Sequence, residues 1–212
     1  MTSTDARTES NLPRREREAR GMTDYWDIRS ADYDATHEVA DRGTWRRMLG
    51  GLVGDDRELR IVDVATGTGL IANLLAEQGY SHVTGVDLSE GMMSHARRYA
   101  AERGLTVDYR VGNALELPFP DASFDVVISS RLLWTLTEPD AAVREWARVL
   151  LPGGTLIAIN ELEPGEGIRL SPLDDYRAKA QVDELPFANA DIDDILAALA
   201  SAGLLGARMQ HL

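Results

Sequence analysis

The chain contains no cysteine, which excludes disulfide bonds, catalysis by a thiol nucleophile and metal sites with cysteine ligands. Its four histidines do not show the spacing of metal ligands; they are His37, His82, His95 and His211. We therefore predict no metal site. Lysine is almost absent beside a large excess of arginine, which indicates a bacterial genome rich in G and C.

The chain also lacks long apolar runs and an excess of positive charge. No run approaches the roughly 18 apolar residues of a membrane-spanning helix, and the N-terminus lacks the apolar core of a signal peptide. We expect a cytoplasmic protein without a membrane partner. The net charge of −13 argues against a nucleic-acid partner, because phosphate binding normally requires a basic surface.

The most informative segment is a glycine-containing turn at residues 63–69, Asp-Val-Ala-Thr-Gly-Thr-Gly. An apolar run precedes it and apolar residues at helical spacing follow it, which predicts a buried strand, a turn and a helix. Gly67 and Gly69 can adopt backbone angles closed to other residues, and the helix that follows presents free N–H groups. We interpret this turn as a nucleotide-cofactor loop.

A second strand is predicted at residues 82–87, and its final acid, Asp87, lies about 20 positions after Gly67. A carboxylate at the tip of such a strand can accept hydrogen bonds from both hydroxyls of a ribose. Residues 67–72 also satisfy the G-x-G-x-x-A dinucleotide pattern. On these two elements alone, the protein could also be a nicotinamide or flavin enzyme.

Five segments together resemble the ordered motifs of class I S-adenosylmethionine-dependent methyltransferases: residues 63–69, 85–89, 113–121, 123–127 and 151–154. The likeness extends from about Tyr25 to the C-terminus. It is closest to the small-molecule (type 11-like) methyltransferases, whose motifs include the segment L-P-F-P-D-x-S-F-D. Dinucleotide enzymes are not expected to carry that segment.

The resemblance implies that S-adenosylmethionine is the cofactor, that Asp63 orients its methionine end and that Asp87 binds its ribose. Leu88 and Met92 would pack on the adenine, although apolar residues at this spacing also serve simply as core. For Asp63 the alternative is a helix-capping acid. The remaining implied cofactor contacts are Tyr25, Tyr33, Ala65, Thr66, Gly67, Gly69, Asn113, Ala114, Leu115 and Ser130.

The sequence departs from the family pattern at three places. Ala65 stands where the first glycine is usual, Asn113 where aspartate is common, and Leu133-Trp134 where histidine often follows the fourth strand. Because alanine disfavours positive φ, we expect the first turn of the loop to be ordinary. Asparagine can offer adenine both a donor and an acceptor.

Strand and helix patterns alternate through the rest of the chain, which predicts a Rossmann-like, doubly wound α/β fold with a mostly parallel sheet and helices on both faces. Further strands are predicted at residues 106–111, 124–129, 155–160 and 204–212, and helices at 138–150 and 191–202. Thr137 is expected to cap the first of these helices, and Pro152-Gly153-Gly154 to end it.

The expected division is a flexible tail at residues 1–21, a helical cap at 22–57 and the cofactor-binding domain at 58–212. The family usually adds a hairpin and a last antiparallel strand after the sixth. We expect that strand to be absent here, in either a truncated or a naturally short sequence. The resulting unpaired edge invites pairing with another chain, so a homo-oligomer through the C-terminal strand is expected as one arrangement.

We expect residues 161–190 to form an acidic insertion or lid. Ten acids and three bases lie between Glu161 and Asp194, a distribution that suits a cationic acceptor or simply a solvated surface. The candidates for catalysis are Tyr33, His37 and Arg131, and Trp134 and Glu161 are further side chains that could face the acceptor. Tyr33 could equally be a packing residue, and Arg131 could hold an acceptor carboxylate or pair with a nearby acid.

The predicted chemistry is in-line transfer of a sulfonium methyl group to nitrogen or oxygen of a small-molecule acceptor, in which positioning supplies most of the rate. Two other functions stay open. One is a non-catalytic domain that binds the cofactor or a partner chain. The other is a nicotinamide or flavin oxidoreductase, which the glycine pattern favours and the segment 113–121 opposes.

Overall fold

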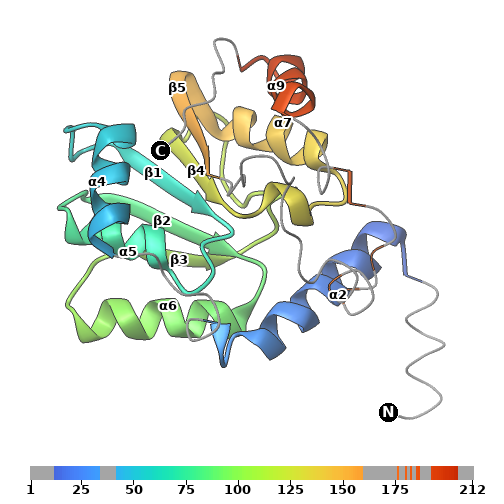
Figure 1. Cartoon of the computed structure of the whole chain (residues 1–212), viewed down its shortest axis with the longest axis horizontal. Coiled ribbons are helices and arrows are strands. Elements are labelled where there is room, and N and C mark those ends of the chain that lie inside the picture. The colour runs from blue at the N-terminus through green and yellow to red at the C-terminus, as the bar shows by residue number, and fades with distance from the viewer. Residues whose placement is uncertain are drawn as a thin grey trace.

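The computed structural model describes residues 12–33, 42–159, 176, 180, 182, 185–186 and 192–204. In these residues a five-stranded sheet is surrounded by helices (Figure 1). The strands are β1 (Arg60–Val64), β2 (His82–Asp87), β3 (Asp108–Val111), β4 (Phe124–Ser130) and β5 (Leu150–Ile159). The helices are α2 (Arg14–Arg29), α4 (Arg42–Val53), α5 (Leu70–Glu77), α6 (Glu90–Glu102), α7 (Pro139–Val149) and α9 (Ile192–Ser201), with the 3₁₀ helix η1 (Leu133–Thr135).

The sheet has the strand order β3-β2-β1-β4-β5, and every neighbouring pair is parallel. The chain winds outward from β1 to β3, then crosses back and winds outward again through β4 and β5. Ligands of such sheets lie beyond the carboxyl ends of the strands, where the winding reverses between β1 and β4. The predicted Rossmann-like α/β fold is confirmed. Residues 205–212, which contain most of the predicted sixth strand, lie outside the described residues.

The two faces of the sheet bury alternate side chains of the same strands, as the two-residue period of a strand requires. In β1, Val62 and Val64 belong to a cluster that includes Trp146 of α7, whereas Ile61 packs in a second cluster with Leu74 of α5. All five side chains are fully buried, and burial stabilises by roughly 1.5–3 kcal/mol for each aliphatic side chain. This packing fixes the positions of the strand tips.

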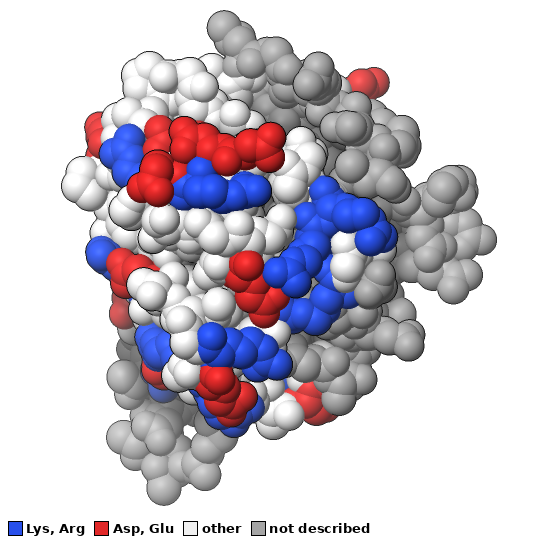
Figure 2. Space-filling view, turned by 90° about the vertical axis from the view of Figure 1, so that its left-hand side faces the viewer, with Lys and Arg blue, Asp and Glu red and all other residues white. Residues whose placement is uncertain are grey.

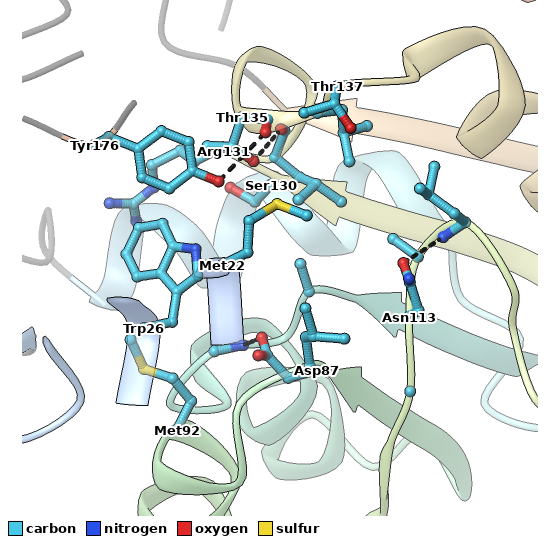
Figure 3. Close-up of a pocket in the computed structure, with 18 of the residues that line it drawn as sticks. Met22, Trp26, Asp87, Met92, Asn113, Ser130, Arg131, Thr135, Thr137 and Tyr176 are labelled. Carbon is cyan, nitrogen blue, oxygen red and sulfur yellow. Dashed lines mark hydrogen bonds between the residues drawn. The ribbon is translucent and has the colours of Figure 1, made fainter. Parts of the chain in front are cut away.

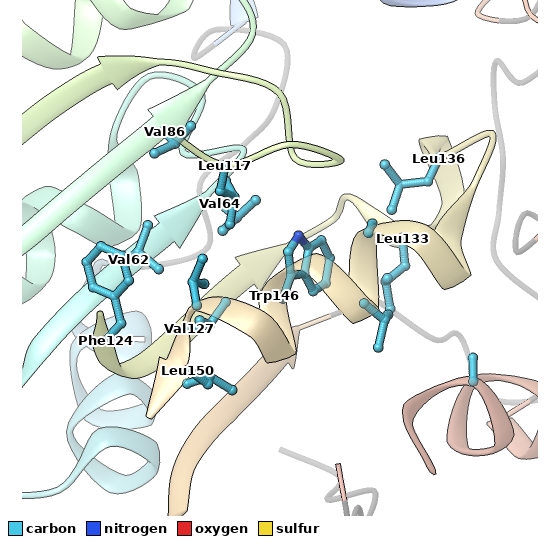
Figure 4. Close-up of a cluster of buried hydrophobic side chains, with 14 of the residues drawn as sticks. Val62, Val64, Val86, Leu117, Phe124, Val127, Leu133, Leu136, Trp146 and Leu150 are labelled. Carbon is cyan, nitrogen blue, oxygen red and sulfur yellow. The ribbon is translucent and has the colours of Figure 1, made fainter. Parts of the chain in front are cut away.

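One core residue reaches directly toward the loop that follows β3. The Trp146 ring lies in the middle of the first cluster, close to Val64 and Leu133 (Figure 4). Its indole Nε1–H donates a hydrogen bond to the carbonyl oxygen of Ala114, at 3.0 Å. A buried indole N–H requires such a partner, and the bond ties this loop to the core.

Part of the segment predicted as a flexible tail is helical, because α2 begins at Arg14 and not after Gly21. The segment is polar, but one face of it buries Gly21, Met22 and Tyr25 against other elements. A Cβ at Gly21 would lie 2.1 Å from the carbonyl oxygen of Ala180, so the backbones approach closely there. Tertiary packing therefore stabilises this helix despite its polar composition.

The ends of α7 also differ from the prediction. The N-cap residue is Glu138 instead of Thr137, without a side-chain capping bond, and Pro139 occupies the first turn. The helix ends at Val149, so residues 152–154 lie inside β5 and do not terminate the helix. β5 is an edge of the described sheet, where proline is tolerated. A Cβ at Gly154 would lie 2.9 Å from the carbonyl oxygen of Asp125, so glycine allows β5 to approach β4.

Candidate active site

A pocket lies beyond the carboxyl ends of the strands (Figure 3). The space between its walls, including the open mouth, is about 830 Å³. α2, the loops after β1, β2, β3 and β4, and Tyr176 contribute its walls. The lining residues are Met22, Trp26, Tyr33, Ala65, Gly67, Asp87, Leu88, Met92, Gly112, Asn113, Ala114, Leu115, Ser130, Arg131, Leu132, Thr135, Leu136, Thr137 and Tyr176.

Asp87 stands at the tip of β2 with both carboxylate oxygens already oriented. Oδ2 accepts a hydrogen bond from the backbone N–H of Gly67 at 2.8 Å, and Oδ1 accepts one from the N–H of Ser89 at 2.9 Å. Burial raises the pKa of Asp87, while these two N–H groups and that of Leu88 act in the opposite direction. A carboxylate has about four lone-pair sites, so Asp87 can still accept a hydrogen bond from a ligand.

The loop after β1 takes a left-handed path at three residues: Ala65 with φ 57°, Gly67 with φ 56° and Gly69 with φ 82°. The expectation of an ordinary first turn at Ala65 is therefore wrong. The backbone must curl beneath the pocket at this point, and alanine follows at a conformational cost. A Cβ at Gly67 would meet no atom within 4 Å, which leaves open space above the loop.

Asp63 lies beneath this loop and does not line the pocket. Only 1% of its surface is exposed to solvent. Its Oδ2 accepts hydrogen bonds from the Thr66 hydroxyl at 2.6 Å and from the Ala72 N–H of α5 at 3.2 Å. Burial raises the pKa of Asp63 to about 7. Through these hydrogen bonds, Asp63 holds the loop against the first turn of α5.

The lower part of the pocket offers an apolar wall and one amide. Leu88 and Met92 both line it, although Met92 is only 2% exposed and also belongs to the protein interior. The side-chain Oδ1 of Asn113 accepts a hydrogen bond from the Leu115 N–H at 2.9 Å. The amide NH₂ of Asn113 therefore offers a donor, and its oxygen is already engaged by the backbone.

α2 covers the pocket and is attached to the first turn of α6. Met22 and Trp26 on this helix line the pocket. The Oδ1 atom of Asp27 accepts hydrogen bonds from the Ser89 hydroxyl and from the Gly91 N–H, the latter at 2.9 Å. The covering helix is thus fixed to the segment that immediately follows Asp87.

The opposite end of the pocket follows β4. Arg131 has φ 56°, and its N–H donates to the Ile159 carbonyl oxygen at 2.8 Å. Beside it, the buried Ser130 hydroxyl has no hydrogen-bond partner in the part of the chain that the structure describes. The Thr135 hydroxyl donates to the Leu132 carbonyl oxygen at 2.8 Å.

Of the predicted site residues that the structure describes, five do not line the pocket: Tyr25, Asp63, Thr66, Gly69 and Trp134. Tyr25 is buried with its ring centroid 4.9 Å from those of Trp26 and Tyr176, so it supports lining residues from behind. His37 and Glu161 lie outside the described residues, as does most of the acidic insertion. The other predicted cofactor contacts, together with Tyr33 and Arg131, do line the pocket.

Sequence reasoning missed several lining residues, among them Met22, Trp26, Thr135, Thr137 and Tyr176. Trp26 adjoins the predicted Tyr25 within the same aromatic stretch, so the helical period offered a signal for it. Tyr176 offered none, because it lies in a segment notable only for its acids and reaches the pocket through tertiary packing.

Arginine and acidic side chains lie interleaved on the face shown in Figure 2, with one larger area of arginine. Ion pairs between such side chains occur in the described part of the chain, for example Arg42 with Glu77 and Arg60 with Asp125, both at 3.0 Å. None of the helices in the described part of the chain is long and apolar enough to cross a membrane.

Residues 62–158 match the methyltransferase-domain family. The ubiquinone/menaquinone biosynthesis C-methyltransferase UbiE of Shewanella sp. (strain ANA-3) is 31% identical over 179 residues, which cover 79% of this chain and 70% of that protein. The chain belongs to the class I S-adenosylmethionine-dependent methyltransferases. The predicted family and its cofactor, S-adenosylmethionine, are thereby confirmed, and the oxidoreductase alternative is not supported.

Two further relatives show how far the likeness extends. The demethylmenaquinone methyltransferase of Thermus thermophilus is 37% identical over 64% of this chain, but the chain spans only 63% of that protein. The solved structure of the [4+2]-cyclase SpnF is 30% identical, with a TM-score of 0.60 over 76% of this chain and 56% of that one. Methyltransferase domains of this fold thus have relatives with other named activities.

The pocket of this domain suits S-adenosylmethionine on three structural grounds. The Asp87 carboxylate keeps acceptor capacity beside the glycine loop, as a ribose requires. The space over Gly67 admits close approach to the backbone. The buried Ser130 hydroxyl has no hydrogen-bond partner among the residues that the structure describes, and a polar ligand would supply one.

Proposed function

We propose that this domain transfers a methyl group from S-adenosylmethionine to a small-molecule acceptor that occupies the end of the pocket after β4. The observation that carries the proposal is the continuity of one pocket from Asp87 at the tip of β2 to Ser130 and Arg131 at the tip of β4. A donor and an acceptor can therefore lie in contact beneath α2.

The residues divide between the two molecules according to their positions. Asp87 would hold the ribose, Leu88 and Met92 would pack on the adenine, and the Asn113 amide would donate to its edge. The loop 65–69 would pass beneath the methionine end, with Asp63 holding that loop from below. When bound, S-adenosylmethionine supplies an electrophilic methyl group on its sulfonium centre.

The protein contributes positioning and exclusion of water. Met22 and Trp26 of α2 close the pocket from above, and their apolar surfaces would keep water from the reacting atoms. Tyr33 and Arg131 line the same space and are the candidates to orient the acceptor. In-line alignment supplies most of the rate in such a transfer, so a dedicated base is not required for an acceptor that is already ionised.

The names of the relatives extend the choice of acceptor atom. The sequence led us to expect nitrogen or oxygen, whereas the Shewanella relative is named a C-methyltransferase. Ring carbons activated by an ionised hydroxyl therefore join nitrogen and oxygen as acceptors. The SpnF relative motivates a second candidate function, a domain that uses the same pocket for another reaction.

The decisive experiment measures methyl transfer itself. The purified chain is incubated with S-adenosylmethionine carrying a labelled methyl group and with separate pools of phenols, quinols and amines. We expect labelled product and stoichiometric S-adenosylhomocysteine with at least one pool, and their loss in Asp87→Ala. Cofactor binding without transfer to any pool would support the second candidate and contradict methyl transfer to these acceptors.

A further inference from the structure

The last two turns of α7 carry an ion pair that does not line the pocket. The guanidinium of Arg148 donates through Nε and Nη2 to the two carboxylate oxygens of Glu145, at 2.8 and 2.6 Å. Both side chains are partly buried. Hydrogen bonding to Arg148 lowers the pKa of Glu145, so both groups are charged at neutral pH.

Both members of this pair bind the backbone of the loop that follows β3. The Leu117 N–H donates to Oε1 of Glu145 at 2.7 Å. Arg148 donates to the carbonyl oxygens of Leu117 at 3.3 Å and of Phe119 at 2.9 Å, and also to the mostly exposed Asp121 carboxylate at 2.7 Å. One ion pair thus satisfies three backbone groups of a segment that lies in no helix or strand.

The anchored backbone continues directly into the turn that carries Asn113. The Glu116 N–H donates to the Asn113 carbonyl oxygen at 2.9 Å, and the Leu115 N–H donates to its side-chain Oδ1 at 2.9 Å. At the other end of the turn, the Gly112 N–H donates to the Asp87 carbonyl oxygen at 2.9 Å. Gly112, Asn113 and Leu115 line the pocket. The turn is therefore held between the tip of β2 and α7.

Core packing supplies less direction to this loop than the ion pair does. The Leu117 side chain is buried in the cluster that contains Trp146 (Figure 4), and the Trp146 indole donates to the Ala114 carbonyl oxygen. Apolar contacts are non-directional, whereas hydrogen bonds restrict the orientation of the peptide groups that make them. Loss of the Arg148 and Glu145 bonds would leave the Leu117 side chain buried and release the backbone around it.

We propose that Arg148 is a positioning residue for cofactor binding: paired with Glu145, it holds the backbone of residues 117–119 and thereby orients the Asn113 amide toward the adenine. The inference rests on the proposed function, because that function assigns the adenine to this side of the pocket. Arg148 acts through the loop and does not touch the cofactor itself.

A double-mutant cycle on cofactor affinity tests this role. Calorimetric titration with S-adenosylhomocysteine compares the wild type, Arg148→Lys, Asn113→Ala and the double variant. Lysine keeps the positive charge but lacks the planar fork that binds Glu145 and the carbonyl oxygens together. We expect Arg148→Lys to weaken binding by about fivefold to tenfold in the wild-type background and by less than about twofold in Asn113→Ala. Equal losses in the two backgrounds would overturn the proposal.

A second variant approaches the pair from the other side, in case Arg148→Lys does not fold. Glu145→Gln retains an oxygen that can accept from the Leu117 N–H, but it removes the charge that holds the guanidinium. It should weaken binding of S-adenosylhomocysteine, and this loss should also be smaller in the Asn113→Ala background. Wild-type affinity in a folded Glu145→Gln variant would contradict the role of the pair.

The matched control is Arg60→Lys. This arginine pairs with Asp125 at 3.0 Å and begins β1, at the end of the strand away from the pocket. Arg60→Lys should change the affinity for S-adenosylhomocysteine by less than about twofold, as should Arg47→Asn at an exposed position of α4. A loss in Arg60→Lys as large as that in Arg148→Lys would show a general effect of arginine ion pairs and refute a specific role of Arg148.

Amide exchange locates the effect in the chain without any ligand. In Arg148→Lys the hydrogen-bonded amides of Leu115, Glu116 and Leu117 should exchange faster than in the wild type, whereas those of β1 should not change. Uniform acceleration across the sheet would assign Arg148 to general stability and overturn the proposal. Failure of S-adenosylhomocysteine to bind the wild type would contradict the proposed function, and the exchange result would still decide whether Arg148 holds the loop.

Discussion

The Asp87 carboxylate accepts a hydrogen bond from the Gly67 N–H at 2.8 Å, which joins the tip of β2 to the glycine loop after β1. The same carboxylate accepts from the Ser89 N–H at the start of α6. One side chain thus fixes the relative positions of three segments that surround the proposed ribose site. Loss of this carboxylate should therefore affect both ligand binding and the apo structure.

Asp87→Asn should raise the Kd for S-adenosylhomocysteine by at least about tenfold, because one acceptor oxygen and the charge are lost. The same change should lower the free energy of unfolding by about 1–3 kcal/mol, since an N–H of Gly67 or Ser89 loses its partner. Calorimetric titration and urea unfolding measure the two effects. Unchanged affinity in a folded variant would argue against Asp87 as a ribose ligand.

Ala65→Gly should stabilise the apo protein by about 0.5–1 kcal/mol, because glycine adopts φ 57° without the steric strain that the alanine Cβ causes. The affinity for S-adenosylhomocysteine should change little. Ala147→Gly in α7 is the matched control, and it should destabilise by about 1 kcal/mol, as in any helix interior. Destabilisation of similar size by both variants would show that Ala65 is not strained.

The buried Asp63 predicts a pH-dependent stability. Its pKa is raised from 3.8 to about 7 by burial, so the folded state holds a proton that the unfolded state has released. The free energy of unfolding should therefore fall as pH rises from 3.8 to about 7 and become constant above that. The shift corresponds to a total on the order of 4 kcal/mol. Asp87, whose pKa is also raised, acts in the same direction.

Asp63→Asn tests the origin of that dependence, because asparagine is uncharged and can still accept from Thr66 and Ala72. Urea unfolding across the same pH window should give a flatter profile for the variant and a higher stability than the wild type above pH about 7. Parallel profiles would assign the pH dependence to other groups.

Asp27→Ala should loosen α2 from α6, because it removes the acceptor of the Ser89 hydroxyl and the Gly91 N–H. We expect a loss of about 1 kcal/mol in stability, as for other capping acids. Faster amide exchange in α2 and a several-fold weaker affinity for S-adenosylhomocysteine should follow, since this helix carries Met22 and Trp26. Unchanged exchange in α2 would show that other contacts hold the helix.

The fold could be predicted because its determinants are local. Alternating and continuous apolar runs predicted both ends of β2 correctly. For the other described strands, most of the predicted ends lie within a few residues of the observed ends. The largest error concerned β5, which begins at Leu150 because an edge strand accommodates Pro152 and the following glycines. The start of α2 was missed because its packing against Ala180 and Tyr176 is not visible in its polar composition.

The end of the pocket around Asp87 was predictable for the same reason, since motif spacing placed Gly67, Asp87 and Asn113 at neighbouring strand tips. The left-handed φ of Ala65 could not be predicted, because the loop imposes this conformation and alanine itself does not favour it. Tyr176 joins the pocket through contacts among distant segments, which spacing cannot reveal. Thr135 and Thr137 follow a strand without any motif to distinguish them.

Calorimetric titration of the purified chain with S-adenosylhomocysteine tests the central claim most directly, because every assigned role depends on this pocket being the cofactor site. The account predicts binding at one site per chain, and loss of that binding in Asp87→Ala but not in Arg47→Asn. The absence of any binding heat, across several temperatures, from a protein shown to be folded by circular dichroism would contradict it.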